Sequence, residues 1–109
     1  MANTFKLKTK ANVGVTTVGI YTAPAATTTG VIGITMANTS GSGVNVGVGI
    51  TRAGTTEDVK LLKNAPIPSG SSLEFMAGNK IVLETTDTVT VDSDTNNSVD
   101  AALTIMEIT

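Results

Sequence analysis

Short stretches in which apolar and polar residues alternate run along most of the chain. The clearest covers residues 44–51, where three valines and an isoleucine alternate with Asn, Gly and Thr. A period of two is typical of a β-strand that buries one face. The same pattern predicts strands at 4–11, within 12–21, and at 29–38, 44–51, 56–64, 72–76, 80–84, 88–92 and 98–108.

Clusters of Gly, Pro, Ser and Asn between these stretches predict turns. They lie at 23–26, 39–43, 52–55 and 93–97, and the strongest strand breaker is Ala65–Gly70 with its two prolines. Ala77-Gly78-Asn79 indicates a hairpin loop that joins the strands on either side of it. The spacing of apolar residues in 56–64 also suits one helical turn, but its β-rich neighbours favour a strand.

The composition supports an all-β fold. The chain holds 20 Thr, 12 Val and 8 Ile among 109 residues, and β-branched side chains pack well on a pleated sheet. Eight or nine short strands with regular turn signals predict a single antiparallel β-sandwich, jelly-roll or Ig-like. We expect one domain, with residues 1–10 as an N-terminal strand or arm and 11–109 as the sandwich.

Two predicted strands are apolar on both faces, which one sandwich interior cannot cover. In 29–38, Val31 is expected on one side and Ile32, Ile34 and Met36 on the other; in 98–108, Met106 and Ile108 lie opposite Leu103 and Ile105. We expect the second apolar face of these strands to be covered by another copy of the protein or a larger assembly. The alternative is that loops of this chain cover it. The glycines of 44–51 leave a bare outer face, open to the close approach of another backbone or subunit, or to solvent.

Several kinds of chemistry are excluded by absent residues. The chain has no His, Cys or Trp, which removes disulfides, thiolate metal sites and the commonest general base. Carboxylates occur at Glu57/Asp58, Asp87 and Asp92/Asp94, but no spacing marks two of them as catalytic partners. We expect no enzyme activity, no catalytic residues and no cofactor.

The charge balance argues against nucleic acid and membranes as partners. Seven basic and nine acidic residues give a formal net charge of −2, whereas nucleic-acid binders concentrate basic charge. No apolar run is long enough to span a membrane, and residues 1–6 do not begin a signal-peptide core. We therefore expect synthesis in a cytoplasm.

One loop has a partial calcium-binding pattern. Asp92, Asp94, Asn96 and Asp100 place oxygen atoms at alternating positions. Asn97 stands where a calcium loop needs Gly, and Leu103 stands where it needs a bidentate Glu. Because Asp and Asn also close turns through their side chains, the turn interpretation is favoured and no metal site is predicted.

Three lysines, Lys6, Lys8 and Lys10, share one face of the first predicted strand, and Phe5 and Leu7 share the other. Lysines guard exposed edge strands against aggregation. They also form a positive stripe that can dock on an acidic partner. The candidate partner interface is Phe5, Lys6, Lys8 and Lys10, and deletion of residues 1–10 is expected to abolish binding while the domain stays folded.

The chain resembles small β-rich virion structural proteins of tailed bacteriophages, in particular marine and cyanobacterial phages. The resemblance lies in Ile20–Pro24, Thr27–Thr29, Ala37–Thr39, Ala65–Glu74 and Gly78–Glu84, followed by Asp87. It is a pattern of strands and turns, and Thr86 stands where such proteins usually have Gly before the aspartate.

This resemblance implies a capsid decoration protein at the virion surface. Its partners would be the major capsid protein or other virion proteins, and the protein would be a homo-oligomer. The alternative is a small tail- or fibre-associated module that takes part in host receptor binding, although only three aromatic residues are available to stack on sugars.

Overall fold

The computed structural model describes residues 3–52, 57–75 and 81–109, with Phe75 described by its backbone. Within these ranges no helix is long and apolar enough to cross a membrane. All regular structure there is β-strand, which confirms the predicted fold class. The strands are β1 (Asn3–Val13), β2 (Val18–Thr22), β3 (Thr28–Asn38), β4 (Val44–Arg52), β5 (Glu57–Ile67), β6 (Ser72–Phe75), β7 (Ile81–Leu83), β8 (Asp87–Ser93) and β9 (Val99–Ile108).

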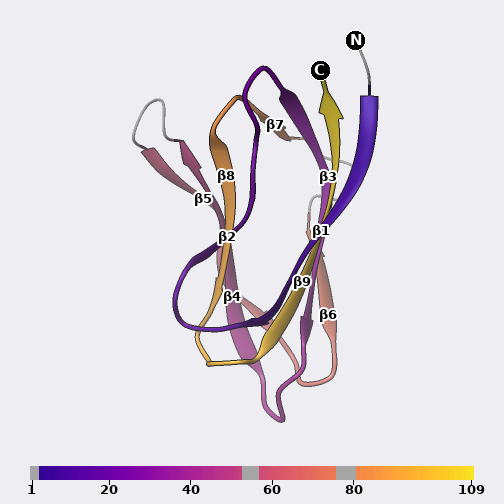
Figure 1. Cartoon of the computed structure of the whole chain (residues 1–109). Coiled ribbons are helices and arrows are strands. Elements are labelled where there is room, and N and C mark those ends of the chain that lie inside the picture. Colours follow the sequence, from indigo (N-terminus) through magenta and orange to yellow (C-terminus); the bar gives the residue numbers. More distant parts are fainter. Residues whose placement is uncertain (1–2, 53–56, 76–80) are drawn as a thin grey trace.

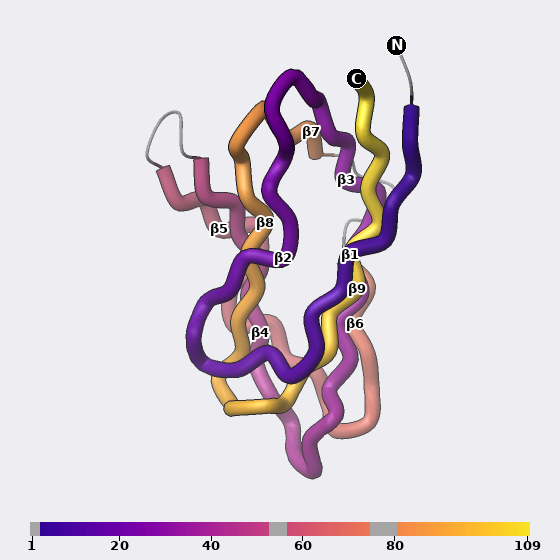
Figure 2. Tube along the Cα trace, in the orientation of Figure 1, coloured from indigo at the N-terminus to yellow at the C-terminus, as the bar shows by residue number. Residues whose placement is uncertain are grey.

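The strands form two sheets that pack face to face (Figure 1). Sheet A has the order β1-β9-β3-β6, with β7 also paired to β3, and sheet B has the order β2-β8-β4-β5. Every strand pair is antiparallel. The tube in Figure 2 shows the two sheets side by side along their length, with both ends of the chain at the same end of sheet A.

The strand pairs are nested, and this nesting decides the topology. Strand β1 pairs with β9, β2 with β8, β3 with β6 and β7, and β4 with β5. Successive pairs alternate between sheets A and B, as if one long hairpin were rolled up. This arrangement is a jelly roll, so the choice that the sequence left open between jelly-roll and Ig-like topology is resolved.

The predicted hairpin around 77–79 is wrong in its strand pairing. Strand β6 pairs antiparallel with Ile34–Ala37 of β3, and β7 pairs antiparallel with Thr29–Val31 of the same strand. They therefore run in the same direction and fill one strand position in two pieces. The loop residues Ala77-Gly78-Asn79 themselves lie outside the described residues.

Strand β5 continues through the predicted breaker, to Ile67. Pro66 lies within it opposite Asn45, and it is tolerated because β5 is the edge of sheet B, where a missing N–H breaks no ladder. The alternative of a helical turn in 56–64 is wrong for residues 57–64, which belong to this strand. Asn64, with φ 55°, marks an irregularity between the pairs Val48–Leu62 and Val46–Ala65.

A bulge in β3 changes which side chains enter the core. The pairing with β9 shifts between Val31 and Gly33, so Val31, Ile34 and Met36 are all buried while Ile32 points outward and is 39% exposed. The expected phase, with Val31 opposite Ile34 and Met36, is therefore wrong. In β9 the prediction is confirmed, because Leu103 and Ile105 are buried and Met106 and Ile108 lie on the outer face.

The core fills the space between the sheets. Its largest fully buried side chains are Met36, Ile67, Leu83, Leu103 and Ile105. Valines of β4, β8 and β9 pack around them. Burying such side chains supplies the main driving force for folding a chain of this size.

Candidate interaction surface

The outer face of sheet A carries an apolar row that crosses four strands. Phe5 of β1 lies opposite Met106 of β9, Met106 opposite Gly30 of β3, and Gly30 opposite Val82 of β7. Phe5 is 68% exposed and Val82 is 64% exposed. Leu7, one position further along the same face of β1, is 65% exposed. The described residues leave this second apolar face uncovered, contrary to the alternative that the chain's own loops cover it.

Few charges lie on this face. Among the described residues that point outward from sheet A, the charged ones are Glu74 of β6 and Asp100 of β9. Both lie toward the end of the sheet away from the row of Phe5. Depletion of charge together with aromatic and Met side chains is characteristic of the centre of protein interfaces.

Two shallow hollows lie along the middle of the same face. One, of about 290 Å³, lies over Ile32, Gly33, Thr35 and Thr104, and the other, of about 380 Å³, lies over Thr9, Ala37 and Asp100. Thr35 and Ala102 line both hollows. The two hollows are therefore adjacent along β3 and β9, where small side chains leave the space unfilled.

The outer face of sheet B is built differently. Gly47 and Gly49 of β4 are buried there, because Asp92 and the β5 backbone lie over them: a Cβ on Gly47 would lie 2.5 Å from Asp92 Oδ1, and one on Gly49 would lie 2.8 Å from Val59 O. The expected close approach at these glycines is therefore made by this chain's own strand, and the solvent-face alternative is wrong. Lys60 Nζ lies 3.9 Å from Asp92 Oδ2 on this face.

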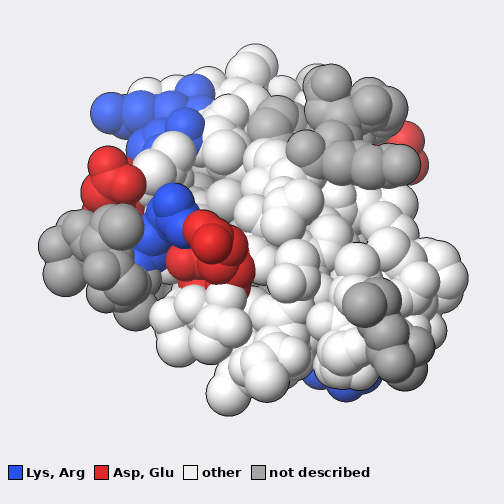
Figure 3. Space-filling view, turned by 90° about the horizontal axis from the view of Figure 1, so that it is seen from above, with Lys and Arg blue, Asp and Glu red and all other residues white. Residues whose placement is uncertain are grey.

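Figure 3 shows the end of the sandwich that carries the chain termini, with charged side chains gathered mainly toward one side and most of the remaining surface uncharged. The distribution of charge at this end of the molecule is therefore uneven.

The structure separates the predicted partner residues into two groups on opposite faces of β1. Phe5 points outward with the apolar row, whereas Lys6, Lys8 and Lys10 lie opposite Ile105, Leu103 and Ala101, which face the core. The lysines are on the inner side of an edge strand, a position that discourages sheet-to-sheet aggregation. Within the described part of the chain, Lys8 and Lys10 form no ion pair.

Lys6 belongs to a buried polar network that holds β1 to β2. Its Nζ lies 2.8 Å from Glu107 Oε1, and the Tyr21 hydroxyl donates to Glu107 Oε2 at 2.6 Å and lies 2.8 Å from Thr29 Oγ1. Lys6 and then Tyr21 lower the pKa of Glu107. Burial and the adjacent Glu107 raise the pKa of Tyr21 to about 12. The charge of Lys6 is therefore already compensated within the chain.

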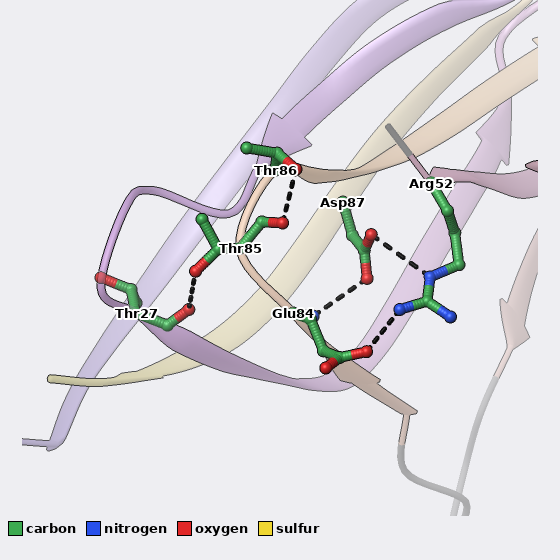
Figure 4. Close-up of polar contacts among 6 residues, drawn as sticks. All are labelled: Thr27, Arg52, Glu84, Thr85, Thr86 and Asp87. Carbon is green, nitrogen blue, oxygen red and sulfur yellow. Dashed lines mark hydrogen bonds and ion pairs between the residues drawn. The ribbon is translucent and has the colours of Figure 1, made fainter. Parts of the chain in front are cut away.

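A second polar cluster, shown in Figure 4, closes the turn before β8. The Arg52 Nε donates to Asp87 Oδ1 at 3.3 Å, its Nη2 pairs with Glu84, and Asp87 Oδ2 accepts the Glu84 backbone N–H at 2.9 Å. Glu84 and then Asp87 raise the pKa of Arg52 above its ordinary value. Thr86 has φ 72°, a conformation that favours glycine. Thr86 is also the residue that stands before Asp87 where the phage proteins that this sequence resembles usually have Gly.

The carboxylates of the 92–100 segment accept hydrogen bonds from different parts of this chain. Asp92 accepts from Thr17 Oγ1, Asp94 from the Asn45 backbone N–H, and Asp100 from the Asn12 backbone N–H. Among the described residues no three acidic side chains gather as metal ligands would. These carboxylates therefore hold distant segments together, and the turn itself is closed by serines: Ser93 Oγ accepts the Thr95 backbone N–H at 3.2 Å, and Ser98 Oγ donates to the Thr95 carbonyl at 2.6 Å.

Sequence reasoning found Phe5 and the outward position of Met106 but missed the surface as a whole. Val82 and Gly30 join the apolar row only because β7 and β9 both pair with β3. The signal available in the sequence was Leu7, which follows Phe5 by two residues and therefore lies on the same face of the strand.

No protein-family profile matches this chain, and no curated protein matches it. Solved structures do match. One is a protein of the Bacillus endospore appendages, which form disulfide-linked pili. It superposes with a TM-score of 0.57 and 16% identity, over 99% of this chain and 87% of that one. The infectious bursal disease virus T13 particle protein superposes with a TM-score of 0.60 and 12% identity, over 96% of this chain. A chain of the Gx strain of that virus gives 0.56 and 15%, over 97% of this chain.

At these identities the likeness is one of fold. This chain spans about a third of the length of the two viral chains, at 30% and 31%. The described residues therefore define a jelly-roll module whose sheet A has an apolar, charge-poor outer face.

Proposed function

We propose that this protein is a structural component of a virion, which decorates and stabilises the capsid exterior by binding major capsid subunits. It acts by contact area and not by catalysis. The observation that carries the proposal is that the described residues leave two surfaces open to partner chains: the apolar outer face of sheet A and the edge strand β1 with Lys8 and Lys10, which form no described ion pair. Surfaces of this kind mark interaction sites.

The fold supports the proposal by analogy. Jelly rolls are common in capsid and lectin domains, and two of the superposed structures come from particles of infectious bursal disease virus. Fold alone does not imply function. The proposed role therefore depends on the surface, and the resemblance of the sequence to small phage virion proteins adds the capsid exterior as the location.

The contact with the capsid is assigned to the edge strand β1. Lys8 and Lys10 carry charges that no described acidic side chain pairs with, and they lie on the same strand as Phe5 but on its opposite face. A positive edge of this kind fits an acidic surface on the capsid. Lys6 contributes less, because Glu107 already neutralises it.

The test is binding to emptied mature shells of the virus that encodes this chain. Binding should raise the melting temperature of the shells and weaken as ionic strength rises. A stained gel of purified virions should show hundreds of copies, as expected of a protein repeated over a symmetric shell. Binding to tail components instead of shells, with a few copies per virion, would overturn the proposal and favour the receptor-binding module.

Matched charge reversals locate the contact. Lys10→Glu should weaken shell binding at least about tenfold, whereas Lys63→Glu, an equal change at an exposed position of β5, should leave it unchanged. Equal losses in both variants would show that only net charge matters and would remove β1 from the interface. Deletion of 1–10 is a weaker test, because these residues pair with β9 along most of its length.

A further inference from the structure

The described outer face of sheet A matches itself when one copy is turned over and laid on another. The decisive feature is the order of positions across the apolar row: Phe5, Met106, Gly30, Val82, on β1, β9, β3 and β7 in turn. Large side chains occupy three positions, and a glycine occupies the third of the four. We infer that this face pairs two copies of the chain about a twofold axis that runs along the strands, between β9 and β3.

Rotation about that axis places each large side chain of one copy over a small residue or an apolar side chain of the other. Met106 meets the partner copy's Gly30, Phe5 meets its Val82, and Thr104 meets its Gly33, and each contact occurs twice. A side chain on Gly30 would have open space, since the nearest atom to its Cβ lies 4.0 Å away. The space above Gly30 is thus open to the end of the partner copy's Met106.

The two acidic residues of the face avoid each other in this arrangement. Asp100 lies opposite Ala37 within sheet A and Glu74 opposite Thr35. The twofold axis therefore sets Asp100 over the partner copy's Ala37, and Glu74 over a residue of its β1. Like charges do not meet, and both carboxylates lie at the rim, where interfaces are polar and wet.

The size of the face suits a stable pair. Four strand positions and the ten residues of β9 give an outline roughly 19 Å wide and 33 Å long at standard strand spacing and rise. This outline, roughly 600 Å², approaches the roughly 800 Å² of accessible surface that each partner buries in a typical specific interface. Two sheets stacked with strands nearly aligned are also a common mode of sheet packing.

The first experiment measures the mass of the isolated protein in solution by sedimentation across a range of concentrations. The wild-type chain should be a dimer that dissociates on dilution. Val82→Glu should raise the dissociation constant at least about tenfold, because the pair contains the Val82 contact twice. Val15→Glu is the matched control: Val15 is also exposed, at 56%, but does not belong to sheet A, and its variant should dimerise as the wild type does.

The second experiment tests the geometry in a way that does not depend on the stability of a variant. Because the chain has no cysteine, a single Thr104→Cys next to the axis should be joined to its counterpart by a short thiol-reactive crosslinker. Thr22→Cys, exposed on β2 of sheet B, should not. A monomeric or trimeric wild type, dimerisation unaffected by Val82→Glu, or crosslinking only through Thr22 would each overturn the inference.

The twofold pair does not rest on the proposed function, and the experiments distinguish the failure of one from the failure of the other. A monomer whose binding to shells is lost in Val82→Glu would assign this face to a capsid partner, overturning the twofold pair and leaving the capsid role in place. A dimer with the expected crosslink that does not bind shells would leave the pair in place and remove the capsid role.

Discussion

Tyr21 shows how a single residue joins the two sheets. It comes from β2 in sheet B, and its hydroxyl reaches Glu107 of β9 and Thr29 of β3 in sheet A. Lys6 of β1 completes the group through Glu107. A buried polar group is costly unless it is hydrogen-bonded, and in this network each member satisfies another. The lysine that the sequence offered as a partner residue thus has a structural task within the fold.

The stability of the protein should fall between pH 10 and pH 12 because of Tyr21. Its pKa is about 12 in the folded chain against 10.0 for an ordinary tyrosine, so the unfolded chain loses the phenolic proton first and ionisation favours unfolding. Tyr21 is the only tyrosine and there is no Trp, so the ultraviolet absorbance of phenolate reports this one group.

The measurement is a pH titration of that absorbance beside melting curves at each pH. Glu107→Gln should lower the pKa of Tyr21, since the carboxylate raises it. Tyr21→Phe should lose the part of the alkaline destabilisation that the phenol causes. An ordinary tyrosine pKa in the folded wild type would contradict the network.

At the scale of elements, two glycines, one from each sheet, have opposite surroundings. Gly49 of β4 lies under the Val59 carbonyl and Thr90 Oγ1, at 2.8 Å and 3.1 Å from an ideal Cβ, whereas Gly30 of β3 has its nearest neighbour at 4.0 Å. Sequence alternation identified both strands but not this difference. The difference depends on which strand lies alongside, and the β5 register that brings Val59 over Gly49 contains two irregularities.

Alanine at these two glycines should therefore have opposite effects on stability. Gly49→Ala should destabilise the fold by about 1–3 kcal/mol, because a backbone carbonyl must move. At a protein concentration low enough to keep the chain monomeric, Gly30→Ala should be neutral or stabilising by up to about 1 kcal/mol, because it restricts the unfolded chain without a clash within the monomer. Chemical denaturation of both variants measures the free energies of unfolding, and an equal cost at both positions would contradict the packing described.

At the scale of the whole molecule, the nested strand pairs make most contacts distant in sequence. Phe5 pairs with Met106 and Asn3 with Ile108, so the first and last strands meet only after the chain has been closed into a large loop. Such closure costs entropy and slows folding. It also brings the two chain ends together at one end of sheet A (Figure 1).

A circular permutant tests this topology. Linking the original ends with a short flexible peptide and opening the chain at the exposed Gly70, where φ is 74°, should yield a folded protein, because β1 and β9 then become neighbours in sequence. Its refolding, followed by circular dichroism, should be faster than that of the wild type. A matched permutant opened at the buried Leu103 should not fold, and failure of the Gly70 permutant would contradict the adjacency of the ends.

The sequence by itself determined the all-β class, most strand positions and the alternation of Leu103 and Ile105 with Met106 and Ile108, because alternation and turn chemistry are local properties of a chain. Tertiary structure alone decided that β6 and β7 share one strand position, that a bulge turns Ile32 outward, that Pro66 is accepted at a sheet edge and that Lys6 binds Glu107. Each of these depends on which distant strand becomes a neighbour. Local patterns do not carry that information, since pairing is chosen by the packing of the complete core.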